Sequence, residues 1–242
     1  MSALLPPTNG PSHNLKTLQL TGITSMLSLE NPSSPSSSPS ASPSASLKWK
    51  VLIYDIAGRS IISPLLSVSA LRSLGVTLHL LISTTRTAIP AVPAVYFLEP
   101  TESNIRQIAL DAKNNLYSAG LHINFTRKLP RPLLELLGQL LVQYNAVAAV
   151  LSVVDRYLDF VSLEPTLFTL NHKTSYKLVH GNTATEDSVN QYMETCVSSL
   201  TSLLSLYPGM PIIKTPTAGP GNYLGSMLCK SLKVRPTTRR GL

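Results

Sequence analysis

The sequence predicts an α/β protein in which an open parallel sheet carries helices on its faces. Short apolar runs alternate with helical patterns over about eighty residues, and this alternation is typical of strand–helix–strand units. Hydrophobic residues make up 43% of the 242 residues, which is enough to form a core. A segment rich in serine and proline precedes the first apolar run. We therefore expect a globular α/β region that follows a tail.

The tail is recognised by the string NPSSPSSSPSASPSAS at residues 31–46. A proline at every three or four positions, with serine between, supports neither a strand ladder nor a core. We predict that residues 1–47 form a disordered tail.

The first strand is predicted at WKVLIYD, residues 49–55, a continuous apolar run typical of a strand covered on both faces. Residues 62–75 have leucine and valine near helical spacing, and Gly75 is a common helix stop signal. Two further apolar runs predict strands at residues 76–83 and 94–100. The order of these segments is strand, helix, strand, strand.

A second helix is predicted over residues 101–117. Thr101 is a suitable N-cap because its hydroxyl can accept a hydrogen bond from the first turn, and Pro100 marks the break after the strand. The string GLHINFT, residues 120–126, predicts a fourth strand.

Two apolar segments follow Pro132, at Leu133–Gln143 and Ala146–Tyr157. We interpret them as a helical hairpin, although AVAAVLSVV, residues 146–154, also fits a strand. Several polar side chains lie within this stretch, so a membrane span there would be costly.

The remaining part of the chain predicts a smaller set of elements. These are a pair of strands, a long amphipathic helix, a further strand and a final helix, at residues 167–172, 175–181, 183–207, 210–216 and 222–232. Residues 233–242 are predicted to be an irregular basic tail.

The net charge of +8 does not indicate a nucleic-acid-binding protein. Much of the excess lies in the last thirteen residues, at Lys230, Lys233, Arg235, Arg239 and Arg240. The other charges form no basic stripe with interleaved aromatic residues. Cys196 and Cys229 are too few for a disulfide framework or a zinc site, which fits a reducing cytosol.

No motif identifies a catalytic, cofactor or metal site, because the chain lacks a P-loop string, a Gly-x-Ser-x-Gly elbow and histidines at metal-ligand spacing. Asp55 ends the first strand without a second acid at Ala57, so we interpret it as the cap of the following turn. The glycine loop 219–225 resembles a dinucleotide fingerprint, but Pro220 removes one amide. We expect no cofactor; the alternative is a nucleotide- or phosphate-binding α/β enzyme that uses Asp55 and this loop.

Four strings carry a resemblance to one family: WKVLIYDIAGRSIISPLLSVSALRSLGVTLHLL, IPAVPAVYFLEPTESNI, DRYLDFVSLEPTLF and MPIIKTP. Together they resemble the SM (Sec/Munc) family of syntaxin-binding vesicle-fusion proteins, and within it the Sly branch. The resemblance implies a five-stranded parallel domain at residues 48–160 and the first part of a second α/β domain at residues 161–232. It also implies that this sequence is an N-terminal fragment relative to the family.

The resemblance further implies a non-catalytic, SNARE-binding regulator of vesicle docking and fusion in ER–Golgi transport. Its expected partner is the N-terminal peptide of a Golgi or ER syntaxin and, for a full-length form, the assembled SNARE complex. The expected location is cytoplasmic, with peripheral association to ER and Golgi membranes through SNAREs.

The family's peptide pocket lies in the first domain, between the two helices of the hairpin. The matching positions here are Leu134, Leu137, Gly138, Val150, Val153 and Asp155. Leucines and valines three positions apart would each face one way on their helices, and Asp155 would meet a basic residue of the peptide. We predict that Leu137→Lys abolishes peptide binding and leaves the fold intact.

Overall fold

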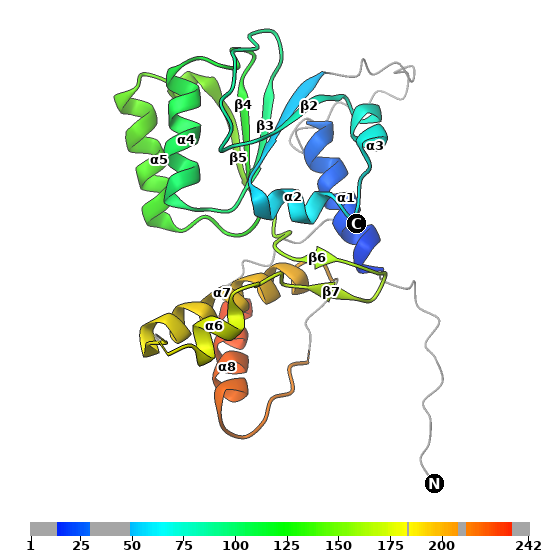
Figure 1. Ribbon diagram of the computed structural model, residues 1–242, viewed down its shortest axis with the longest axis vertical. Helices are drawn as coiled ribbons and strands as arrows, with labels where there is room; N and C mark the ends of the chain where they lie inside the picture. The colour runs from blue at the N-terminus through cyan, green and yellow to red at the C-terminus, as the bar shows by residue number, and fades with distance from the viewer. Residues whose placement is uncertain (1–13, 30–48, 183, 208–211, 234–242) are drawn as a thin grey trace.

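A five-stranded parallel sheet forms the centre of the larger region of the protein (Figure 1). The computed structural model describes residues 14–29, 49–182, 184–207 and 212–233. The strand order is β2-β1-β3-β4-β5, and the strands are β1 (Lys50–Tyr54), β2 (Val76–Leu81), β3 (Ala94–Leu98), β4 (Leu121–Phe125) and β5 (Val150–Asp155). The predicted α/β class and the five-stranded parallel sheet are confirmed.

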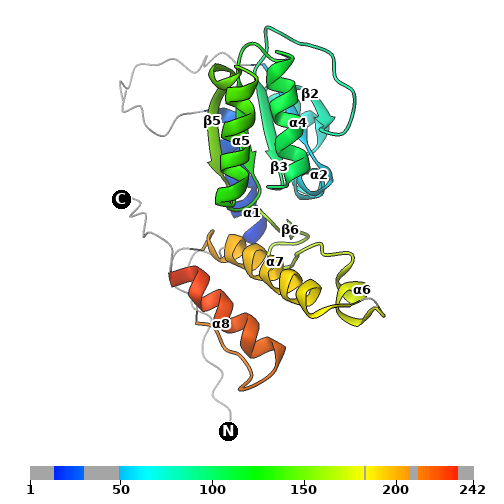
Figure 2. The same ribbon diagram turned by 90° about the vertical axis from the view of Figure 1, so that its left-hand side faces the viewer.

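Helices cover both faces of this sheet, so the residues of β1 and β3 are all buried (Figures 1 and 2). One face packs against α4 (Glu102–Lys113) and α5 (Arg131–Gln143). The other face packs against helices nearer the N-terminus, which are α1 (Leu15–Ser28), α2 (Ile56–Ile62) and α3 (Val68–Ser73). Strands covered on both sides lose the polar–apolar alternation of half-exposed strands, which explains the continuous apolar runs in the sequence.

Asp55 is the N-cap of α2 and also joins two strand ends. Its side chain accepts hydrogen bonds from the backbone N–H of Gly58 (2.7 Å) and Glu99 (2.8 Å) and from the amide of Asn104 (2.8 Å). Gly58 fits this turn because an added Cβ would lie 2.4 Å from the carbonyl oxygen of Phe97. The interpretation of Asp55 as a cap is confirmed.

The helix predicted over residues 62–75 is wrong in its extent. The structure has two short helices there, α2 and α3, with Pro64 between them. Proline lacks the backbone N–H that a continuous helix requires, so the helix stops before it. Gly75 ends the segment as expected, with a left-handed φ of 82°. Thr101 caps α4 by accepting a hydrogen bond from the N–H of Asn104, as predicted.

The disordered tail predicted over residues 1–47 is wrong for residues 15–28, which form α1. Asn14 caps this helix, and Ile23, Met26 and Leu27 are buried against the sheet. Burial of this apolar face stabilises the helix. Residues 1–13 and 30–48, which include the serine- and proline-rich string, lie outside the described residues.

Gln19 fixes α1 to the segment that follows β5. Its Nε2 donates to the carbonyl oxygens of Leu158 (3.3 Å) and Phe160 (2.5 Å), and its Oε1 accepts from the N–H of Ser162 (3.3 Å).

We expect Gln19→Ala to lower the free energy of unfolding by about 2 kcal/mol, because buried backbone groups would lose their partners. Urea denaturation would measure this. Thr21→Ala, at an exposed position of the same helix, is the control, and an equal effect of both variants would contradict the prediction.

The described part of the second region, from residue 161 onward, contains a two-stranded sheet and three helices. Strands β6 (Val161–Ser162) and β7 (Phe168–Thr169) pair antiparallel. The helices are α6 (Ser175–His180), α7 (Glu186–Leu204) and α8 (Pro220–Lys233), and α8 packs on α7 (Figure 2). The long predicted helix is confirmed as α7, which begins at a capping box between Thr185 and Ser188.

Two strands predicted in this region are wrong. Residues 175–181 form the short helix α6, and β7 pairs instead with β6. The strand predicted at residues 210–216 lies partly outside the described residues, and residues 212–216 form neither helix nor strand. Short apolar segments of this kind fit a helix or a strand equally well.

The second helix of the predicted hairpin is also wrong. After α5 the chain makes a short turn at Val147–Ala149 and then forms β5. Asn145 ends the helical path with a left-handed φ of 52°, and the β-branched valines that follow favour a strand. The alternative of a strand within residues 146–154 is confirmed.

Within the part of the chain that the structure describes, no helix is both long and apolar enough to cross a membrane.

Candidate partner-binding site

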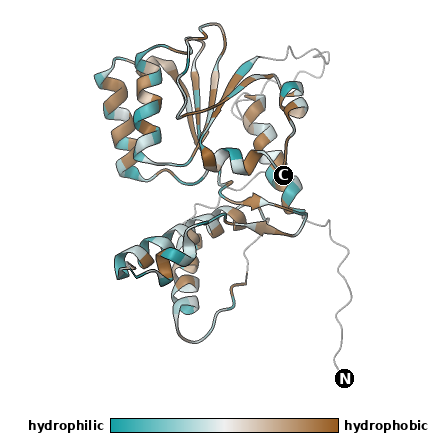
Figure 3. Cartoon of the chain, in the orientation of Figure 1, coloured by the Kyte–Doolittle hydropathy of each residue, from teal (hydrophilic) through white to brown (hydrophobic). Residues whose placement is uncertain are grey.

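Helix α5 provides one side of the candidate site. It begins after Pro130 and has Pro132 in its first turn, where the missing N–H has no helical partner to lose. Leu137, Leu140 and Leu141 face the sheet and belong to its main core cluster. Most residues of α5 are leucine or valine, and most of this helix has the brown colour of hydrophobic residues in Figure 3. The helix is therefore apolar on more than its buried side.

An exposed apolar stripe runs along the outside of α5. Leu134 is 50% exposed and Val142 is 70% exposed. Gly138 lies between them at the same spacing of four residues, and an added Cβ there would meet nothing within 4 Å. Gly138 thus leaves open space between two exposed apolar side chains. Val142 was missed from the sequence, although its distance of four from Gly138 is the signal that places it on this face.

Strand β5 provides the other side, at the edge of the sheet. Among the described strands it pairs only with β4. Val150 is half-buried against the core cluster that contains Leu137, whereas Val153 is 41% exposed. The site is therefore bordered by a helix and an edge strand, and the predicted border of two helices is wrong.

Val150 and Val153 were predicted to face one way because they are three positions apart on a helix. They lie on a strand instead, and their common orientation has another cause. Three positions on a regular strand would place two side chains on opposite faces. However, the register between β4 and β5 shifts after Val150, so Val150 pairs with Leu121 and Val153 pairs with Ile123. Leu121 and Ile123 both face the core under α5. The register shift therefore places both valines on the face of the sheet that α4 and α5 cover.

Asp155 ends β5 and holds the loop that leads into α5. Its Oδ1 accepts a hydrogen bond from the N–H of Leu129 (3.1 Å). Burial raises the pKa of Asp155 above its usual range, while the hydrogen bond from Leu129 and the charge of Lys128 oppose that rise. Oδ1 of Asp155 thus binds the backbone of the loop that precedes α5.

The six predicted residues lie on α5 and β5 but differ in exposure. Leu134, Gly138 and Val153 are exposed, and Val150 and Asp155 are half-buried. Leu137 is only 2% exposed, so it presents almost no surface to a partner. It packs α5 onto the sheet.

The two features that suggested an enzyme have structural tasks instead. Asp55 is fully engaged as a cap, and Gly225 lets α8 approach its preceding loop, since an added Cβ would lie 2.1 Å from Cγ2 of Thr215. No group of three or more His, Cys, Asp or Glu side chains suited to a metal ion occurs in the described part of the chain. The nucleotide- or phosphate-binding alternative is not favoured.

The sheet order and the covering helices define a doubly wound α/β protein. Residues 50–239 match the Sec1 family, and the chain belongs to that family. The predicted resemblance to the SM family is thereby confirmed.

Named relatives and solved structures agree with this assignment. The "SEC1 family transport protein SLY1" of Arabidopsis thaliana is 37% identical over 229 residues, which cover 95% of this chain and 36% of the relative. The human "Sec1 family domain-containing protein 1" is 39% identical over 189 residues, covering 76% of this chain and 29% of the relative. The chain thus spans about a third of the length of these relatives.

Two similar structures are complexes with a partner. The crystal structure of Sly1p in complex with an N-terminal peptide of Sed5p matches with a TM-score of 0.82 and 32% identity, over 92% of this chain and 39% of that one. The Unc18–syntaxin 1 complex from Monosiga brevicollis matches with a TM-score of 0.73 and 25% identity, over 91% and 36% of the two chains.

Proposed function

We propose that this chain binds the N-terminal peptide of a syntaxin-type SNARE and so regulates vesicle docking and fusion between ER and Golgi. The observation that carries the proposal is the match to Sly1p in complex with an N-terminal peptide of Sed5p. The residues 48–160 are proposed as the peptide-binding domain, and residues 161–232 as the beginning of a second domain. The role is non-catalytic, and the location is cytoplasmic with peripheral association to membranes through SNAREs.

The proposed contact surface is the exposed apolar area between α5 and β5. An aromatic side chain of the peptide can occupy the open space beside Gly138, with Leu134 and Val153 as its walls. Full burial of such a side chain stabilises a complex by about 1.5 to 3 kcal/mol. The free oxygen of Asp155 is proposed to accept a hydrogen bond from a basic residue of the peptide.

Leu134→Lys is expected to weaken binding of a synthetic syntaxin N-terminal peptide by about tenfold or more, because it replaces an apolar wall with a solvated charge. The thermal midpoint should remain close to that of the parent chain, since Leu134 is half exposed. Isothermal titration calorimetry would measure the affinity.

Leu163→Lys is the matched control for this experiment. Leu163 is 47% exposed and lies in the chain between β6 and β7, a hairpin that Figure 1 shows apart from α5. Its replacement should leave the affinity unchanged. Equal affinities for the parent chain and Leu134→Lys would overturn the placement of the peptide on this surface.

A further inference from the structure

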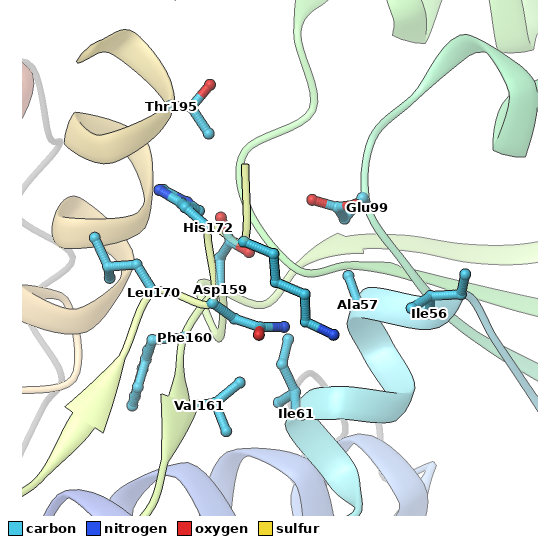
Figure 4. A pocket seen from close by; sticks show the side chains of 12 residues that line it. Ile56, Ala57, Ile61, Glu99, Asp159, Phe160, Val161, Leu170, His172 and Thr195 are labelled. Carbon is cyan, nitrogen blue, oxygen red and sulfur yellow. The ribbon is translucent and has the colours of Figure 1, made fainter. Parts of the chain in front are cut away.

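A cavity of about 250 Å³ lies where the sheet region meets the second region, and we call it the junction cavity (Figure 4). Its lining includes Ile61, Glu99, Asp159, Phe160, Leu170 and His172. Small-molecule sites usually have volumes of about 300 to 1,000 Å³. The junction cavity is smaller, so it suits a single side chain better than a nucleotide or a cofactor.

The cavity lies at the topological switch point of the sheet. From β1 the chain adds β2 on one side and later β3 on the other, so the direction of winding reverses between β1 and β3. Doubly wound sheets hold ligands at the carboxyl ends of the two strands that flank this point. Ile56 directly follows Asp55 at the end of β1, Glu99 directly follows β3, and both line the cavity.

Among the described residues, Arg127 is the cation that forms ion pairs with the two acidic groups at the cavity. Arg127 contacts both Glu99 (3.5 Å) and Asp159 (3.1 Å), and Asp159 also accepts a hydrogen bond from Ser199 (2.7 Å). Two carboxylates therefore share one guanidinium. Burial raises the pKa of Glu99, Arg127 opposes that rise, and the nearby acids Asp55 and Asp159 add to it.

The other side chains that line the cavity indicate which chemical class of ligand it can bind. His172 is half-buried, and burial lowers its pKa, which favours the neutral imidazole. Lys173 also lines the cavity, but its residue is exposed to solvent. Apolar side chains such as Phe160 and Ile61 form the wall beside the carboxylates (Figure 4). This lining disfavours phosphate and suits a cation on an apolar stem.

We propose that the junction cavity receives one arginine side chain of a protein partner. Arg127 contacts Oε1 of Glu99 and Oδ2 of Asp159, and the other oxygen of each carboxylate has no hydrogen bond among the described residues. The incoming guanidinium donates to these two oxygens, and its methylene groups lie on Phe160 and Ile61. Arginine fits better than lysine because its planar donors can bind two carboxylates at once. This contact is separate from the proposed peptide surface on α5 and β5, so either can fail without the other.

The test uses the 242-residue chain and a minimal probe, the tripeptide Ac-Gly-Arg-Gly-NH2. Binding is followed by amide chemical shifts in two-dimensional NMR, and shifts are expected at residues 56–61 and 170–173. The neutral isostere with citrulline in place of arginine should bind at least about tenfold more weakly, because it lacks the charge-assisted hydrogen bonds.

Two variants test the location. Glu99→Gln is expected to weaken the tripeptide by about tenfold or more, whereas Glu102→Gln, an exposed acid on α4, should leave the affinity unchanged. Ala57→Leu keeps both carboxylates and fills part of the cavity, so it should remove binding even if Glu99→Gln were poorly folded. Neither Glu99→Gln nor Ala57→Leu should alter the affinity for a syntaxin N-terminal peptide.

The proposal would be overturned by equal binding of the citrulline peptide, by shifts confined to residues away from the cavity, or by unchanged affinity of Ala57→Leu. Free agmatine provides the last arm of the test. Asn171 and Thr195 line the cavity and can bond to peptide groups, so the tripeptide should bind several-fold tighter than agmatine. Equal affinities would assign the cavity to a small free guanidinium compound and not to a protein partner.

Discussion

Leu137→Lys is expected to unfold the sheet region instead of removing peptide binding alone. Leu137 is 2% exposed and packs in the core cluster between α5 and the sheet. Deleting a buried leucine side chain costs about 2 to 5 kcal/mol, and burying an ammonium group adds to this cost. We therefore expect a loss of at least about 4 kcal/mol in the free energy of unfolding, which urea denaturation followed by circular dichroism would measure.

Leu134→Lys on the same helix is the comparison for this result. Its side chain is half exposed, so the change in the free energy of unfolding should stay within about 0.5 kcal/mol. If Leu137→Lys melted within a degree or two of the parent chain, the packing of α5 on the sheet would be wrong.

Most of the sheet region could be predicted from the sequence because its caps and buried strands depend on neighbouring residues in the chain. Asp55 and Thr101 were placed correctly as caps, since each follows an apolar run and has a side chain suited to that position. Four of the five strands were placed from their apolar runs, and β4 was among them. A buried strand in a parallel sheet is apolar throughout, and this makes it visible without any knowledge of its neighbours.

The missed elements depend on contacts between distant segments. Helix α1 is held by the sheet face and by the bonds of Gln19 to residues near position 160. Strand β5 follows a long apolar helix, and periodicity cannot separate a short apolar strand from more helix. The family resemblance supplied the fifth strand, whereas the local pattern favoured a helical hairpin.

The candidate site was predictable in composition but not in geometry. Leucine or valine occupies most positions of α5, so the sequence does not show that Leu137 faces the sheet and Leu134 faces solvent. The common orientation of Val150 and Val153 depends on a register shift between strands, which leaves no mark in the sequence. Both points required the tertiary structure.

Asp111→Ala is expected to lower the free energy of unfolding by about 3 to 5 kcal/mol, because it removes one partner of a buried ion pair. Both carboxylate oxygens of Asp111 accept hydrogen bonds from Nη2 of Arg86, at 2.7 and 2.8 Å. The hydroxyl of Tyr96 also donates to Asp111 (2.9 Å), and Gln107 donates to it as well (3.1 Å). The change would leave a buried guanidinium without its counter-charge.

Arg86 links this network to the connection between β2 and β3. Its Nη1 donates to the carbonyl oxygens of Leu81, Ile82 and Thr84, so the pair fastens the start of a long loop onto α4. Replacing both charges, as in Arg86→Met with Asp111→Leu, should cost less than Asp111→Ala alone, because no unpaired charge remains. Glu102→Ala, which breaks the exposed pair with Arg106, should cost less than about 0.5 kcal/mol. If Asp111→Ala cost no more than Glu102→Ala in urea denaturation, the buried network would not contribute to stability, and the loop would be held by its apolar contacts.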